Sequence, residues 1–305
     1  MKRPFFRNWF GGRPGRGGDE PARPDETPET AGDGEEARRG MDAAAPESPP
    51  AEACRKRPAL PPDSEAALTL LRIEAENEGD PAGFARGLSL FLAELDDRSR
   101  VKPGALSLLA HALGRLGRWD EAIAAVERAI AIEPDNPALH LNLGAYLAWK
   151  VFYGEGFRIG GDRGLIDRSL CAYRACLQKD PTVVSAWLNT IETRIWLFDW
   201  DQAIGTYGQC GPFMETPADR LVRAWLGSIA LALAGEEILP EDRAPLDAPP
   251  IPPLPRTSYD VNQIERFFEE LARRPDPPRG LPLAREIHRS FLARVQIVTA
   301  DKEGD

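Results

Sequence analysis

The pattern Trp-Asp-x-Ala-Ile occurs twice in the chain, at Trp119–Ile123 and at Trp200–Ile204, 81 residues apart. After the first copy, apolar residues recur three and four positions apart until Glu133 and Pro134, which is the spacing of an amphipathic helix. Asp120 stands at the helix start, where a short acidic side chain is favoured. One helix start that occurs twice indicates a repeated structural unit.

The residues around these starts resemble the tetratricopeptide repeat, a pair of antiparallel helices about 34 residues long. That family has small residues where its helices cross, a large residue before the second helix and a proline after it. Residues 103–136 have Leu106 at the aromatic site of the first helix and otherwise fit the pattern, whereas Cys176 and Cys210 replace an alanine in the next two units. The residues that carry the resemblance are Leu109, Ala110, Gly117, Trp119, Ala122, Ala129, Pro134, Leu143, Gly144, Tyr173, Pro181, Trp187, Trp200, Ala203 and Tyr207.

The distances between the units fit this length with one insertion. Pro134 and Pro181 are 47 residues apart, and the two Trp-Asp starts are 81 apart. One or two repeats of about 34 residues plus a single insertion of about 13 account for both distances. We place the insertion in the glycine-rich stretch 150–168, read as an interhelical loop or a partner-contacting loop, since a phosphate-binding loop would need a preceding strand.

The resemblance implies an all-α, right-handed solenoid of helical hairpins over residues 64–235, clearest from 103 to 210. Residues 64–95 read as a degenerate helix pair at one end, and 218–235 as the first helix of a fourth repeat. The proline-rich stretch 236–257 reads as a linker that replaces the second helix. Residues 258–305 read as a helical tail with an apolar stripe at Val261, Ile264, Phe267, Phe268 and Leu271.

Residues 1–63 are rich in proline, glycine and charge and have few residues that could form a core. Such a segment cannot bury enough apolar surface to offset its chain entropy, so we expect a disordered arm. Its first 16 residues combine basic residues with Phe5, Phe6, Trp9 and Phe10. Together with Arg7, these aromatic residues could contact a protein groove or, weakly, an anionic membrane surface; an inert tail is the alternative.

Composition excludes several classes of function. The net charge of −10 argues against nucleic-acid binding. Four scattered cysteines without a CxxC pair are typical of reduced cytoplasmic thiols, and the three histidines lack metal spacing. No apolar run reaches the length of a membrane span, and no hydrophobic signal-peptide region follows the basic amino terminus. We therefore expect a cytoplasmic protein without catalytic residues, metal or cofactor.

In this family the first helices of the repeats line a concave groove. Asn142, Ala145 and Trp149 follow the same spacing as Asn189, Glu192 and Trp196, 47 residues later. Amides can hydrogen-bond an extended peptide, and Trp is a frequent anchor at binding hot spots, although packing of both Trp side chains against the insertion or the tail is the alternative. The predicted groove residues are His111, Arg115, Leu141, Asn142, Ala145, Trp149, Leu188, Asn189, Glu192 and Trp196.

The resemblance implies a protein-binding adaptor, scaffold or assembly factor whose groove holds a segment of a protein client. The groove lacks the lysine and arginine set of the family's chaperone-tail carboxylate clamps, which disfavours that ligand class. A factor recruited to membranes through its amino-terminal arm is the alternative.

Overall fold

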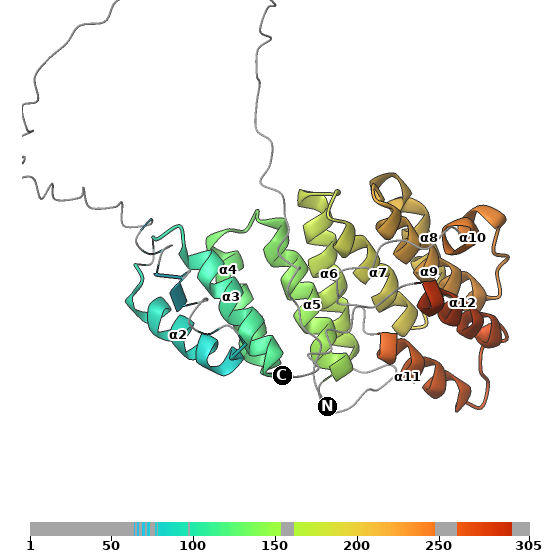
Figure 1. Cartoon of the computed structure of the whole chain (residues 1–305), viewed down its shortest axis with the longest axis horizontal. Coiled ribbons are helices and arrows are strands. Elements are labelled where there is room, and N and C mark those ends of the chain that lie inside the picture. Colours follow the sequence, from blue (N-terminus) through green and yellow to red (C-terminus); the bar gives the residue numbers. More distant parts are fainter. Residues whose placement is uncertain are drawn as a thin grey trace, which may run out of the picture. The chain divides into compact units, whose positions relative to one another are not determined.

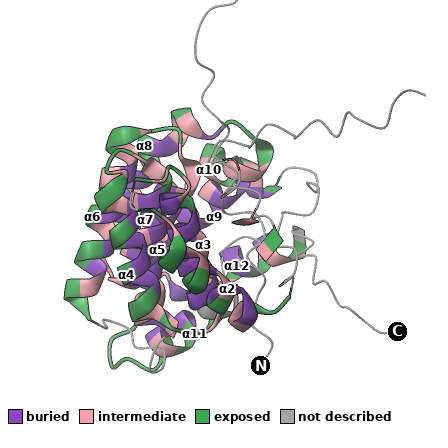
Figure 2. Cartoon of the chain, turned by 90° about the vertical axis from the view of Figure 1, so that its left-hand side faces the viewer, coloured by how far each residue is buried: buried purple, intermediate pink, exposed green. Residues whose placement is uncertain are grey.

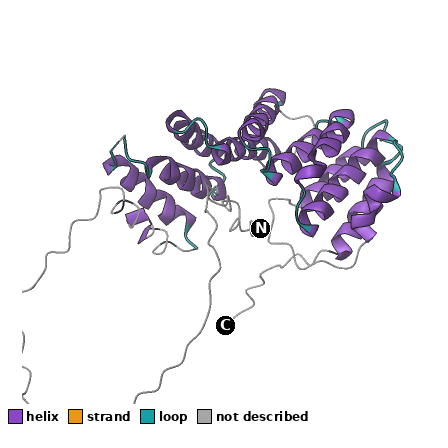
Figure 3. Ribbon diagram, turned by 90° about the horizontal axis from the view of Figure 1, so that it is seen from above, coloured by secondary structure: helices purple, strands orange, loops and turns teal. Residues whose placement is uncertain are grey.

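The computed structural model describes residues 79–96, 98–153, 162–247 and 261–294, with a few single residues between 64 and 77. These ranges contain α-helices and one 3-10 turn, and no strand was found within them (Figure 3). The helices are α2 (Pro81–Glu94), α3 (Lys102–Arg115), α4 (Trp119–Ile132), α5 (Pro137–Tyr153), α6 (Arg163–Lys179), α7 (Val184–Trp196), α8 (Trp200–Cys210), α9 (Pro217–Ala234), α10 (Pro240–Asp247), α11 (Val261–Ala272) and α12 (Leu281–Arg294).

Helices α3 to α8 form three successive hairpins, α3–α4, α5–α6 and α7–α8, and each second helix also packs against the helix that follows (Figure 1). Glycines permit the close crossings between helices: a Cβ at Gly144 would lie 2.5 Å from the Tyr173 ring, and one at Gly227 would lie 2.3 Å from the Tyr207 ring. Both Trp-Asp copies open second helices, as their pattern predicts. The expectation of an all-α solenoid of helical hairpins is confirmed.

The stretch 150–168, predicted to be a loop, is helical at both of its ends. Helix α5 runs through Tyr153 and α6 begins at Arg163, so both ends of 150–168 are helical, and residues 154–161 lie outside the described part. The Asp162 carboxylate accepts a hydrogen bond from the Leu165 backbone N–H at 3.1 Å and caps α6. Because α5 and α6 have 17 residues each, against 14 in α3 and α4, part of the insertion lengthens this hairpin.

Part of the predicted linker 236–257 is a helix, and the expectation is wrong for that part. Helix α10 starts at Pro240. Proline is tolerated at the first helical position, because its missing N–H would have no partner within the helix there. The Tyr207 hydroxyl donates a hydrogen bond to the Asp242 carboxylate at 2.5 Å, which ties α10 to α8, and Leu246 is buried. Residues 248–257 lie outside the described residues.

The predicted helical tail forms two helices that join the core. Helix α12 packs against α9, and Gly280 at its start approaches the Ala232 carbonyl so closely that a Cβ there would lie 1.6 Å from the oxygen. The apolar stripe predicted on α11 is confirmed for the residues whose side chains are described: Ile264, Phe267, Phe268 and Leu271 are at most 1% exposed. Val261 lies at the start of α11.

The buried residues fall into two large clusters and one small one. One cluster runs from Phe84 to Leu147, and the other runs from Ala148 to Phe291. Helix α5 contributes residues to both large clusters; buried residues are purple in Figure 2. Among the described helices, none has the length and apolar character to cross a membrane.

Candidate functional site

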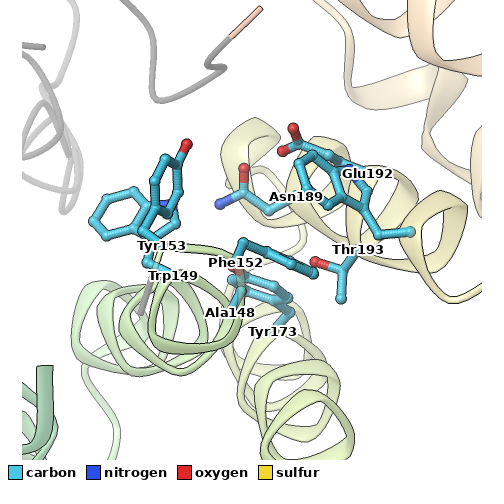
Figure 4. A pocket seen from close by; sticks show the side chains of 9 residues that line it. Ala148, Trp149, Phe152, Tyr153, Tyr173, Asn189, Glu192 and Thr193 are labelled. Carbon is cyan, nitrogen blue, oxygen red and sulfur yellow. The ribbon is translucent and has the colours of Figure 1, made fainter. Parts of the chain in front are cut away.

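A hollow lies between helices α5 and α7, and Tyr173 of α6 is among its lining residues (Figure 4). The hollow is shallow: the space between its walls is about 360 Å³ when the open solvent side is counted, and only about 20 Å³ of it could hold the centre of a water molecule. It combines aromatic, amide and carboxylate side chains, several of which belong to the predicted groove. The lining residues are Ala148, Trp149, Phe152, Tyr153, Tyr173, Asn189, Glu192, Thr193 and Trp196.

Helix α5 supplies one wall through Trp149 and Tyr153, which are one turn apart and half-buried. The Trp149 ring lies edge-on to Trp119 and Tyr146, with ring centroids 6.1 Å and 5.6 Å away. These neighbours come from α4 and from the preceding turn of α5. They fix the orientation of Trp149 before any partner binds, which lowers the entropy cost of using it as an anchor.

Helix α7 supplies the opposite wall through Asn189, Glu192 and Thr193. In Figure 4 the Glu192 carboxylate and the Asn189 amide both point to the open side of the hollow. The Glu192 side chain is half-buried, so its charge is less screened than that of a surface carboxylate.

Tyr173 of α6 lies at the floor of the hollow together with Phe152. Burial raises the pKa of the Tyr173 hydroxyl, and the nearby Glu192 carboxylate raises it further, while hydrogen bonds with Ser169 and Asn189 act in the opposite direction. Tyr173 therefore stays neutral at the floor of the hollow.

Trp196 is a buried contact and does not present its ring to a partner as the sequence analysis expected. It is 4% exposed, and its ring lies 4.3 Å from Phe152 and 5.7 Å from Phe267 between centroids. Phe267 belongs to α11, so the carboxyl-terminal part of the chain covers this end of the predicted groove. The alternative of packing against the tail describes Trp196 correctly.

The other predicted groove residues lie away from the hollow. Asn142 is 2% exposed and donates a hydrogen bond to the Ser107 hydroxyl at 3.2 Å, which links α5 to α3. Burial and the neighbouring Arg115 lower the pKa of the half-buried His111 to about 4. Leu141, Ala145 and Leu188 are core residues, each at most 5% exposed. The hollow thus brings together Trp149, Asn189, Glu192 and Trp196.

Phe152 and Tyr153 were expected in the insertion, where they favour a partner-contacting loop, whereas the structure places them on α5 beside the groove residues. The signal was the i, i+4 spacing of Trp149 and Tyr153, which has meaning only if the helix continues to residue 153. The tip residues Phe5, Phe6, Arg7, Trp9 and Phe10 lie outside the described residues.

Neither a cluster of metal ligands nor a cysteine lies among the residues that line the hollow. Over the described ranges, no three His, Cys, Asp or Glu side chains gather in a group that could hold a metal ion. Burial raises the pKa of the Cys176 thiol to about 12 and also raises that of Cys210, so both thiols remain protonated core groups. What the hollow offers is aromatic surface, an amide and one carboxylate.

One comparison with known protein families agrees with the hairpin architecture. A family model described as a TPR repeat matches residues 110–148, from the middle of α3 to α5. No curated protein matches the chain. A solved thermophilic TPR protein of Thermus thermophilus shares 18% identity and a TM-score of 0.42, with 69% of this chain and 99% of that chain covered. An O-GlcNAc transferase mutant of Thermobaculum terrenum shares 19% identity and a TM-score of 0.37, with 72% of this chain but only 37% of that chain covered.

Proposed function

Because the chain carries tetratricopeptide repeats, whose fold is that of a protein-interaction scaffold, we propose that it is an adaptor or assembly factor that holds a segment of a protein client. The hollow between α5 and α7 is the proposed client site. The proposal assigns no catalytic step to the chain.

The observation that carries the proposal is the pairing of two unlike walls across one hollow. Trp149 and Tyr153 offer preoriented aromatic surface, and Glu192 offers a partly desolvated carboxylate opposite them. Aromatic anchors beside a charged group that is shielded from water are typical of binding hot spots. A client segment with an apolar side chain next to a Lys or Arg would satisfy both walls.

Capture of clients from the native cytosol tests this site. We compare the full chain with the Trp149→Ala/Glu192→Lys double variant and identify bound proteins by mass spectrometry. We expect one or more partners to be lost, because the variant removes the anchor and reverses the charge of the opposite wall. Trp196→Ala is unsuitable, since truncating this buried ring would cost about 3–5 kcal/mol of stability.

The control is Arg128→Ala/Gln178→Ala, which changes exposed residues of the second helices α4 and α6. It should retain every partner. Circular dichroism of all variants establishes that helicity is unchanged. A partner list identical in the hollow variant and in the wild type would overturn the assignment of the client site.

A further inference from the structure

We infer that the amino-terminal tip of the chain, residues 4–10, occupies the hollow between α5 and α7 when no client is bound. This inference rests on the proposed function, since it concerns the same hollow. It makes the tip a built-in competitor of the client.

The chemistry of the tip fits the chemistry of the two walls. The tip carries Phe5, Phe6, Trp9 and Phe10, and residues 1–16 contain five basic and no acidic residues. Aromatic rings would pack against the Trp149 and Tyr153 wall. The Arg7 guanidinium would pair with the half-buried Glu192 carboxylate, an interaction that the shielding from water strengthens.

The spacing of the tip residues suits a helical turn laid in a groove. The four rings follow i, i+1, i+4 and i+5 spacing, which brings them to one side of a helix. Pro4 suits the first helical position, and Gly11 suits the position after the end. A helix of two turns is not stable alone, so this conformation would form only against the hollow.

The segment between the tip and α2 is long enough for the contact. It comprises residues 11–63, rich in proline, glycine and charge, for which a flexible chain has an end-to-end distance of about 40 Å. Neighbouring helices pack about 8–10 Å apart, so the few helices between α2 and the hollow correspond to roughly 20–30 Å. A tether of this length gives an effective tip concentration of about a millimolar, at which even a weak contact is populated.

Cross-linking in the purified full chain, without a client, tests the inference. A photoreactive phenylalanine analogue, p-benzoyl-phenylalanine, replaces Phe6, and cross-linked peptides are identified by mass spectrometry. We expect cross-links to residues 149–153 and 189–193. The same analogue at Ala44, in the middle of the arm, is the positional control and should give no preference for the hollow.

The Trp149→Ala/Glu192→Lys background should remove these cross-links. Mixing chains of light and heavy isotope composition separates contacts within one chain from contacts between copies. Cross-links only between light and heavy chains would overturn the inference in favour of association of two copies. Cross-links elsewhere, or equally abundant ones in the hollow variant, would also overturn it.

Vesicles of phosphatidylcholine and phosphatidylglycerol provide the remaining arm of the test. If the chain binds them through its tip while the hollow gives no cross-links, the tip is a membrane contact and the inference is wrong. If the Trp149→Ala/Glu192→Lys variant loses a client but the wild type gives no cross-links in the hollow, the proposed client site is supported and the tip contact is wrong. Conversely, if cross-links form in the hollow but the Trp149→Ala/Glu192→Lys variant keeps every partner of the wild type, the tip contact is supported and the proposed client site is wrong.

If the tip competes with the client, weakening it should strengthen client binding. The Phe5→Ser/Phe6→Ser/Trp9→Ser/Phe10→Ser variant should bind an identified client about two- to tenfold more tightly than the wild type, because the client no longer displaces an internal occupant. Equal or weaker binding by the variant would contradict the competition.

Discussion

At the scale of the residue, replacing either of two helical glycines by alanine should change the free energy of unfolding in opposite directions. At Gly208 of α8 an added Cβ would have no atom within 4 Å, whereas a Cβ at Gly227 of α9 would lie 2.3 Å from the Tyr207 ring. Gly208→Ala should raise the free energy of unfolding by about 0.5–1 kcal/mol, since alanine is the better helix former. Gly227→Ala should lower it by about 1–3 kcal/mol through overpacking.

Urea unfolding of both glycine variants, followed by circular dichroism, measures the two changes. The pair is matched in chemistry and lies in adjoining helices, so helix propensity cancels between them. Equal stability of the two variants would contradict the close crossing of α8 and α9.

A second residue-scale prediction concerns pH. His288 is fully buried between Trp225 and Phe268, and burial lowers its pKa, although Glu265 at 3.6 Å opposes the shift. The unfolded chain therefore binds a proton more readily than the folded chain. Stability due to neutral His288 is present above the ordinary histidine pKa of about 6.5 and is lost as the pH falls below it.

The variant His288→Phe should flatten the loss of stability between pH 7.5 and pH 5, measured by urea unfolding at each pH. At pH 7.5 the substitution should be tolerated, because no hydrogen bond to either ring nitrogen of His288 is found within the described part. His111, whose pKa burial also lowers, retains its own contribution in this variant, so a residual slope is expected. An unchanged slope would show that His288 does not titrate with unfolding.

At the scale of the element, the Phe267 side chain links α11 to aromatic residues of the repeats. Phe267 is fully buried, and its ring lies within 6.5 Å of Trp196, Phe198 and Trp200 between centroids. Phe267→Ala should cost about 3–5 kcal/mol and release α11 from the end of α7. Hydrogen exchange should then rise in residues 261–272 while residues 102–132 keep their protection.

The control for this helix is Arg266→Ala, which changes an exposed neighbour on α11. It should leave the exchange of α11 unchanged. Uniform loss of protection throughout the chain in Phe267→Ala would contradict a local role for the aromatic contact.

The elements that the sequence predicts well are those whose evidence is local. The hairpins from α3 to α8 follow from apolar spacing and from helix starts such as Trp119 and Trp200, which involve residues of one turn. The burial of Trp196 depends on Phe267, a residue 71 positions later, beyond a proline-rich stretch. Spacing within one helix cannot reveal that contact, so the groove was predicted longer than the hollow that remains open.

Helix α10 was missed for a related reason. A proline-rich composition favours an extended linker, yet Pro240 falls at the position of a helix where proline is tolerated. Its anchoring by the Tyr207 hydroxyl spans 35 residues and has no sequence signature. Half of the predicted groove thus became core, and the insertion became part of one wall, through contacts between elements distant in the chain.

At the scale of the whole molecule, the division of the core at α5 predicts how the chain unfolds. One cluster ends at Leu147 and the other begins at Ala148, so most contacts of each cluster stay on its own side of that point. Solenoids are stabilised by neighbouring units rather than by one global core, and damage therefore spreads over a limited distance. Each half should respond mainly to mutations of its own cluster.

Leu106→Ala and Leu226→Ala make the matched test, since both leucines are 0% exposed and belong to different clusters. Each change should cost about 2–5 kcal/mol. We expect hydrogen exchange in Leu106→Ala to rise mainly over residues 81–132, and in Leu226→Ala mainly over residues 200–294. The hollow stands where the two clusters meet, so client binding should weaken in both variants, by loss of a different wall in each. An equal rise in hydrogen exchange over both halves in either variant would mean that the chain unfolds as one cooperative unit. The hollow would then not mark a boundary between two parts that unfold separately.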